Sequence, residues 1–367
     1  MSLSLNSVMI VKTFSQLSQA LANFRLKKDI KIALVPTMGN LHDGHLHLIS
    51  ESYKVADIVC VSIFVNKNQF AIGEDFDAYP RTEEADIAKI TDMLLSKGIK
   101  LQSCIIYLPS YNEVYQQDAR LYFDIPSLTH KLCGLSRPQM FNGVMQVLLR
   151  FFKQVNPDFV LMGQKDYQQH MVVSAFAKEL FANIAIIPVK TQRNLRGLAL
   201  SSRNSYLTIG KKRQAAILYQ SLKFVASVLN AKLMPSQDNW QITEDAILCF
   251  KKQISCLCKI DVQQNTKLNT PLKELDDFVK TCNINPNTDE NIMDIFLQLK
   301  QYVTHILTLL DFNIDYLELY NQQDLSQQGL NKNNIRLFVA ARLCGVRLID
   351  NLALQEVSYQ TQLPSLS

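Results

Sequence analysis

Strand-like apolar runs alternate with helical patterns from residue 30 to about residue 207, and few folds accommodate this alternation. The strand candidates are Ile30–Val35, Asp57–Val65, Ser103–Leu108, Phe159–Met162 and Ile184–Val189, and the helical segments between them include Thr82–Lys97, Gly143–Val155 and Gln168–Phe181. The pattern predicts an α/β fold with a Rossmann-like, doubly wound parallel sheet and helices on both faces. Because such sheets bind ligands at the carboxyl ends of their strands, polar motifs that follow strands should converge there.

The length of 367 residues predicts two domains. We expect a catalytic domain over residues 1–205 and a smaller α+β domain over residues 206–367. The second domain should hold helices over Thr208–Leu229 and Asn291–Leu310, followed by strands over Asp315–Tyr320, Ile335–Ala341 and Val346–Leu352. The polar stretch 235–290 is expected to be an insertion with short helical pieces, of which residues 261–290 are the flexible part.

Composition and charge argue against several classes of protein. The apolar content of 47% and charged content of 19% are typical of globular proteins. The net charge of +5 is small, so we expect neither nucleic acid nor membrane as a partner. The N-terminus is interpreted as a strand near Val8–Val11 and a helix over Ser15–Phe24, not as a secretory signal. Eight scattered cysteines indicate reduced thiols and a cytoplasmic location.

Two histidines occupy the turn that follows the strand Ile30–Val35. The turn reads PTMGNLHDGH over residues 36–45, and a helix is expected to begin directly after His45. A helix N-terminus suits phosphate, and the turn's glycines would let backbone approach a ligand. His42 and His45 would donate to phosphate oxygens and, if protonated, offset charge that develops at phosphorus. The layout indicates an adenylylating site; the alternative is a glycine turn with two surface histidines.

Polar side chains also follow two other predicted strands. Asn66 and Gln69 offer amide groups to a small polar substrate, although amides at strand ends commonly serve turns. In the segment GQKDYQQ, Lys165 can reach a phosphate, Asp166 can cap a helix or accept from a ribose hydroxyl, and Gln169 lies one turn inside the helix. The ordinary alternative for this segment is a plain helix cap beside a solvated lysine.

Hydroxyl and charged groups occur in three further places. Ser201, Ser202 and Arg203 would form a compact grip for phosphate. Arg137, in the loop before the helix expected at Gly143, would approach the same edge of the sheet. Asp86 has two interpretations, as a neighbour of a metal ion or as a solvated carboxylate on a helix face, and the second is expected.

Taken together and in this order, these motifs resemble those of the pantoate–β-alanine ligase family. The matching segments are Pro36–His45, Ser62–Phe70, Tyr79–Thr82, Ser136–Pro138, Gly163–Gln169, Gly197–Asn204, Asp315–Leu319 and Val339–Asn351. The resemblance implies the HIGH-type nucleotidyltransferase fold shared with class I aminoacyl-tRNA synthetases. It also implies condensation of pantoate with β-alanine, cleavage of ATP to AMP and pyrophosphate with Mg²⁺, and a homodimer.

The resemblance further implies a role for each candidate residue. His42 and His45 would contact the phosphates, with His45 as proton donor and Lys165 as a further catalytic group. The ATP-binding set would also include Met38, Gly39, Gly44, Gly163, Asp166, Ser201, Ser202 and Arg203. Gln69 and Gln169 would hold pantoate, with Gln69 also near β-alanine. No residue is indicated as a Mg²⁺ ligand.

Four polar positions depart from the family's pattern. Gln164 replaces a glutamate, Met140 a histidine, and Asn194 and Arg196 a glutamate and an aspartate. These departures bear on rate and nucleotide affinity more than on the type of reaction. Two other functions therefore stay open: an adenylyltransferase acting on a phosphorylated small molecule, and a catalytically inactive ATP-binding homologue.

Overall fold

The computed structural model describes residues 7–115, 121–233, 239–283 and 291–357. Its contacts divide the chain into two compact units. The first comprises Met1–Gln192 with Leu200–Ser202, and the second comprises Arg193–Ala199 with Arg203–Ser367. The chain therefore passes between the units several times within residues 192–203, just before the boundary expected at residue 205.

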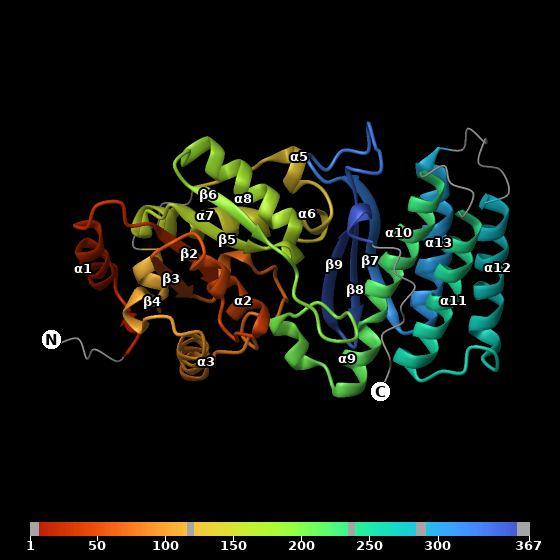
Figure 1. The fold of residues 1–367 in the computed structure, drawn as a ribbon, viewed down its shortest axis with the longest axis horizontal. Helices are drawn as coiled ribbons and strands as arrows, with labels where there is room; N and C mark the ends of the chain where they lie inside the picture. Colours follow the sequence, from red (N-terminus) through yellow and green to blue (C-terminus); the bar gives the residue numbers. More distant parts are fainter. Residues whose placement is uncertain (1–6, 116–120, 234–238, 284–290, 358–367) are drawn as a thin grey trace. The chain divides into compact units, whose positions relative to one another are not determined.

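The first unit contains a six-stranded parallel sheet in the order β1-β4-β3-β2-β5-β6 (Figure 1). Its strands are β1 (Met9–Val11), β2 (Ile32–Thr37), β3 (Ile58–Ile63), β4 (Cys104–Tyr107), β5 (Phe159–Gly163) and β6 (Ala185–Val189). The prediction of a doubly wound parallel sheet is confirmed, with the N-terminal strand paired to β4 at one edge.

Helices cover both faces of this sheet. On one face α2 (Asp43–Ser52) and α3 (Glu83–Ser96) enclose alternate strand residues, such as Val35 and Val61, in one apolar cluster. On the other face α7 (Met140–Val155) packs against β4, and α1 (Phe14–Arg25) and α8 (Tyr167–Leu180) lie beside it. Short helices complete the unit: η1 (Lys67–Gln69), η2 (Leu101–Ser103), α4 (Tyr111–Val114), α5 (Pro126–Thr129), α6 (Cys133–Ser136) and η3 (Gln164–Asp166).

The strand order brings three loops of the first unit to one edge. The chain runs from β2 outward through β3 and β4, then returns to β5 on the opposite side of β2. Ligands of doubly wound sheets bind where the strand order reverses in this way, outside the carboxyl ends of the strands. The turns that leave β3, β2 and β5 therefore lie next to one another, and each carries candidate site residues.

The second unit combines an antiparallel sheet with two layers of helices. Strands β7 (Phe312–Asn321), β8 (Ile335–Leu343) and β9 (Val346–Ala353) form the sheet. Helices α10 (Ile217–Leu233) and α13 (Ile292–Leu309) pack on it, and α11 (Asn239–Cys258) and α12 (Thr266–Asn283) pack on those helices (Figure 1). The remaining elements are η4 (Ser202–Tyr206), α9 (Ile209–Ala215) and η5 (Leu354–Glu356). The helix expected over Thr208–Leu229 is divided into α9 and α10.

The stretch expected to hold short helical pieces contains two long helices, α11 and α12, packed as a hairpin. The expectation of a flexible segment is therefore wrong for residues 261–283. Leu268, Leu272, Leu275 and Val279 are all buried, and their spacing places them on one face of α12. Phe250 of α11 stacks on Phe224 of α10 with ring centroids 4.9 Å apart. Polar residues on the outer faces give the stretch its disordered-like composition. Residues 235–238 and 284–290 of the expected insertion lie outside the described residues.

Within the described residues, no helix combines the length and the apolar character needed to cross a membrane.

Candidate active site

The turn after β2 holds both histidines against the start of α2. This helix begins at Asp43, earlier than expected, so His42 is its N-cap and His45 lies in its first turn. The Nδ1 atom of His42 accepts from the Gly44 N–H at 3.1 Å, and Nδ1 of His45 accepts from the His42 N–H at 3.4 Å. The ring centroids are 4.1 Å apart. Each imidazole therefore accepts a hydrogen bond from a backbone N–H group at the start of α2, where the first N–H groups have no partner within the helix.

These contacts set the protonation of the pair. Because Nδ1 of each ring accepts a hydrogen bond, the proton of the neutral imidazole lies on Nε2. Burial, with a smaller contribution from the Lys165 charge, lowers the pKa of His42 to about 4. Burial, followed by His42 and Lys165, lowers the pKa of His45 well below its usual range. At neutral pH and without ligand, both rings are neutral and each keeps one Nε2–H donor. The protonated histidines considered in the sequence analysis are therefore not the state of the ligand-free protein.

The two glycines of the turn make room for groups of the protein. Gly39 has a φ of +78°, and a Cβ there would lie 3.1 Å from Cγ2 of Ile63 and 3.2 Å from Oδ2 of Asp86. A Cβ on Gly44 would lie 2.9 Å from Nδ1 of His42. The sequence analysis expected these glycines to let backbone approach a ligand. In the structure, the space beside each glycine is occupied by a neighbouring side chain.

A buried carboxylate from α3 holds the same turn. Asp86 has no exposed surface, and it accepts hydrogen bonds from the N–H groups of Asn40 at 2.9 Å and Leu41 at 2.8 Å. The Thr82 hydroxyl donates to it at 3.1 Å. One turn along α3, Lys89 Nζ donates to the Leu41 carbonyl at 2.7 Å. The prediction that Asp86 is a solvated carboxylate is therefore wrong. Its side chain is buried and hydrogen-bonded to the turn that carries His42.

The turn after β5 brings positive charge to the histidines. Lys165 lies in η3 with its side chain only 18% exposed, and its Nζ is 3.4 Å from Oδ1 of Asp166. Asp166 precedes α8, but its carboxylate makes no capping hydrogen bond. The plain cap with a solvated lysine is therefore wrong. β2 and β5 are paired in the sheet, so the two turns leave neighbouring strands. The Lys165 charge contributes to the lowered pKa of both His42 and His45.

The turn after β3 orients the Gln69 amide. Its Oε1 accepts from Asn66 Nδ2 at 3.1 Å, and its Nε2 lies 2.8 Å from Sδ of Met38. Asn66 Nδ2 also donates to the Gly143 carbonyl at 3.0 Å. A Cβ on Gly143 would lie 2.1 Å from the Asn68 carbonyl oxygen, so this glycine lets α7 press against η1. The sequence showed Gly143 only as the expected start of a helix and gave no signal for this contact.

The other loops of the first unit are held by side-chain contacts. Arg137 pairs with Glu74 at 2.6 Å and donates to the Gln69 carbonyl at 3.2 Å, while its Nη1 lies 2.6 Å from Sδ of Met140. Gln169 is half-buried in the first turn of α8. Its neighbour Gln168 is buried, with a side-chain hydrogen-bond network to the 128–133 loop that the sequence did not indicate.

The serine segment is fastened to the histidine turn. The Ser202 hydroxyl donates to the Asn40 carbonyl at 3.0 Å, and Asn40 Nδ2 donates to the Ser202 carbonyl at 3.1 Å. Ser201 lies in the same segment of the first unit, whereas Arg203 belongs to the second unit. The structure thus links Ser202 with the histidine turn and leaves Arg203 with a different part of the fold.

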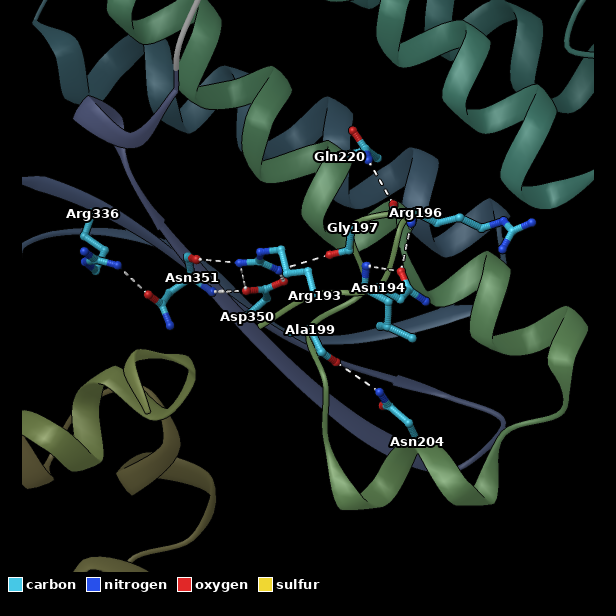
Figure 2. Close-up of polar contacts among 11 residues, drawn as sticks. Arg193, Asn194, Arg196, Gly197, Ala199, Asn204, Gln220, Arg336, Asp350 and Asn351 are labelled. Carbon is cyan, nitrogen blue, oxygen red and sulfur yellow. Dashed lines mark hydrogen bonds and ion pairs between the residues drawn. The ribbon is translucent and has the colours of Figure 1, made fainter. Parts of the chain in front are cut away.

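Residues 193–199, just before the serine segment, belong to the second unit. Figure 2 shows the polar contacts of this loop. The Arg193 guanidinium contacts both carboxylate oxygens of Asp350 in β9, at 2.5 and 2.7 Å. It also lies 3.7 Å from the centroid of the Tyr219 ring and donates to the Gly197 carbonyl at 3.1 Å. A bidentate pair stacked on an aromatic ring gives this loop a strong anchor.

Two positions that depart from the family's pattern lie in this loop. The Asn194 side-chain oxygen accepts from the N–H groups of Arg196 and Leu198, at 3.0 Å each (Figure 2). The Arg196 side chain is exposed. Asn194 therefore closes a turn, a role that asparagine performs well because its short amide reaches backbone donors two residues ahead.

The fold and the site together define the class of protein. The doubly wound parallel sheet, with two histidines in the turn after β2 and a lysine in the turn after β5, is a nucleotidyltransferase fold. A model of the family described as pantoate-beta-alanine ligase matches residues 9–353. The chain belongs to the pantoate–β-alanine ligase family.

Relatives and solved structures agree with this assignment. The pantothenate synthetase of Shewanella woodyi is 33% identical over 339 residues, which cover 92% of this chain and 96% of that protein. The Neisseria meningitidis serogroup B pantothenate synthetase is 46% identical over 200 residues, 54% of this chain and 69% of that protein. A pantothenate synthetase structure from Thermus thermophilus has 27% identity and a TM-score of 0.66, covering 95% of this chain and 99% of that chain. The Francisella tularensis pantoate–β-alanine ligase, complexed with β-γ ATP and β-alanine, has 25% identity and a TM-score of 0.61, covering 95% and 98%.

Proposed function

We propose that this chain joins pantoate to β-alanine and cleaves ATP to AMP and pyrophosphate. The observation that carries the proposal is the pair of neutral imidazoles, each with an Nε2–H donor, beside Lys165 at the switch point of the sheet. Membership of the ligase family supports the choice of substrates.

The first step activates the pantoate carboxylate. A carboxylate oxygen attacks the α-phosphorus of ATP, the bond from that phosphorus to the pyrophosphate oxygen breaks, and pantoyl adenylate forms. His42, His45 and Lys165 donate to the phosphate oxygens as charge builds on them. A fixed donor of this kind contributes about 3–4 kcal/mol, and holding the reactants together contributes about 7–11 kcal/mol. Mg²⁺ would arrive with ATP and would offset negative charge on the phosphates.

The second step forms the amide. The neutral amine of β-alanine attacks the activated carbonyl carbon, the bond to the AMP oxygen breaks, and the nitrogen loses a proton. No covalent intermediate with the protein is required. Gln69 and Gln169 hold pantoate, and the oriented Gln69 amide also lies near β-alanine. The work of the protein is to position the reactants and to stabilise charge.

The remaining candidate residues surround the nucleotide. Met38, Gly39, Gly44 and Gly163 line the ATP site, Asp166 accepts from the ribose, and Ser201, Ser202 and Arg203 hold phosphates. We assign ATP and pantoate to residues 1–205 and a covering, lid-like role to residues 206–367. We further propose a homodimer in the cytoplasm. The family resemblance supports these assignments.

The test is the balance of products. Purified protein receives Mg²⁺, ATP, pantoate and β-alanine, and pantothenate and AMP are measured together. Equal amounts of the two are expected. AMP without pantothenate would mean that the acceptor is wrong, and turnover only with a phosphorylated small molecule would favour an adenylyltransferase. Folded protein without nucleotide turnover would favour an inactive homologue.

A further inference from the structure

Asp86 is a buried carboxylate for which the proposed reaction has no direct use. It is fully enclosed between α3 and the turn after β2. A buried carboxylate is costly unless its oxygens are hydrogen-bonded, and here both oxygens accept from protein donors. The Lys89 ammonium lies 4.0 Å from Oδ1. The oxygens of Asp86 therefore face backbone and protein side chains.

The backbone that Asp86 holds is strained. Gly39 and Asn40 have φ values of +78° and +48°, so two successive residues adopt the left-handed conformation. A non-glycine residue in this region costs on the order of 1–3 kcal/mol, which other contacts must offset. The Asp86 carboxylate accepts hydrogen bonds from the N–H groups of Asn40, the second left-handed residue, and of Leu41, the residue after it. It therefore stabilises the geometry with which the chain enters His42.

Helix α3 also holds the opposite polar group of the turn. Lys89 donates to the Leu41 carbonyl at 2.7 Å, so side chains one turn apart on α3 hold the N–H and the C=O of the same residue. Asn40 is held from another direction by its two hydrogen bonds with Ser202. Leu41 is thus fixed at both backbone groups immediately before the first histidine.

We propose that Asp86 is a positioning residue, which sets the place and ring orientation of His42 and His45 through the backbone of residues 39–42. It does not contact the substrate. This inference rests on the proposed function for its effect on rate, but its structural part concerns the imidazoles alone. If Asp86 acts in this way, its loss should disturb the chemical step more than the binding of ATP.

The experiment compares Asp86→Asn with Asp92→Asn in the full chain. Asp92 is an exposed carboxylate on the same helix and provides the matched control. In Asp86→Asn one backbone N–H meets an amide NH₂ in place of an oxygen. We expect kcat for pantoate-dependent pyrophosphate release to fall about 10²-fold, as for a displacement of about 1 Å, with little change in the KM for ATP. Asp92→Asn should match the unmodified protein in both constants.

Nitrogen NMR of the histidine rings supplies a second measurement. In the unmodified protein His42 and His45 should show the Nε2–H tautomer, and in Asp86→Asn the signals should shift toward a mixture of tautomers. This measurement needs no turnover, so it tests the inference even if pantothenate is not formed. Unchanged ring signals together with unchanged kcat in folded Asp86→Asn would overturn the proposal. A rise in the KM for ATP with kcat unchanged would also overturn it, because Asp86 would then act on binding.

Lys89→Met keeps the experiment decisive if Asp86→Asn does not fold. This variant removes the bond to the Leu41 carbonyl and leaves the carboxylate in place. We expect a smaller loss of kcat and the same direction of change in the ring signals. Unmodified ring signals and kcat in folded Lys89→Met would count against positioning by α3.

Discussion

The turns that leave β2 and β5 start from neighbouring strands, yet they are built differently. In the turn after β2, the space beside Gly39 is filled by protein atoms. The backbone N–H groups of this turn donate to the Asp86 carboxylate and to the two imidazoles. In the second, a Cβ on Gly163 would meet no atom within 4 Å, and a short helix carries Lys165. The first turn is rigid and presents fixed neutral donors. The second presents a charge on a flexible stem, which can follow a phosphate as it moves.

The largest effect should come from the rigid turn. His45→Ala removes a donor whose place is fixed before the reaction, so kcat should fall by about 10²–10³-fold in steady-state assays. His47→Ala is the matched control, because His47 lies on the same helix and its nearest acidic partner is Glu51, 4.0 Å away. A folded His45→Ala variant with normal kcat would show that His45 has no role in the chemical step.

The turn after β5 should respond through charge. Lys165→Met removes a charge-assisted hydrogen bond worth about 1.5–3 kcal/mol, so kcat/KM for ATP should fall about 10–100-fold. The pKa of His42 should rise in the same variant, because Lys165 lowers it. Lys178→Met, at an exposed position near the end of α8, should change neither quantity. An NMR titration with no shift for His42 would contradict the proximity of the two turns.

Glycine substitution in the rigid turn should destabilise the fold. Gly39→Ala places a side chain at a φ of +78° and against Asp86, so the free energy of unfolding should fall by about 1–3 kcal/mol. Urea unfolding measures this change. Equal stability of the variant and the unmodified protein would mean that the turn is not held as tightly as its contacts indicate.

The pH dependence of stability should carry the signature of His42. Unfolded protein binds a proton on this ring below its ordinary pKa of 6.5, whereas the folded protein binds it only below about 4. The free energy of unfolding should therefore rise with pH between these values, by at most about 1 kcal/mol per pH unit from this group. His42→Asn keeps an acceptor for the helix cap and should flatten the slope. The same slope in that variant would assign the effect to other groups.

The smallest effect is expected at Gly163. This residue has a φ of −73° and open space around its Cβ position, so Gly163→Ala should change stability by less than about 0.5 kcal/mol. Because Gly163 is assigned to the ATP site, an effect of the added methyl group on activity should appear in the KM for ATP. A loss of stability as large as that of Gly39→Ala would contradict the open space around the Cβ position of Gly163.

The sheet and most of its helices could be predicted because their signals are local. Each strand is a short apolar run, and the spacing of apolar residues identifies α3 and α8 to within a residue or two. The helical hairpin was missed because the outer faces of α11 and α12 are polar, and composition outweighed the spacing of Leu268, Leu272 and Leu275. Attention to that spacing would have found α12.

The site shows the same division. Residue type and place after a strand predict that the histidine turn and Lys165 contact phosphate, and the structure confirms that these residues lie in the turns after β2 and β5. Asp86 was misassigned, although it lies four and seven residues before Ile90 and Met93 and so shares their buried face. An aspartate on the buried face of a helix needs a partner, but nothing local in the sequence names that partner.

The sequence by itself determined the order of strands and helices, the residues that follow each strand, and the chemistry those residues can perform. Only the tertiary structure decided which of them are buried and what they contact. Asp86 meets Asn40 across 46 residues of chain, and Ser202 meets Asn40 across 162. The neutral state of the histidines, their Nε2–H donors and the support of the turn all depend on such contacts. Burial and partner choice are set by packing between distant segments, so a local pattern can predict an element but not the environment of its side chains.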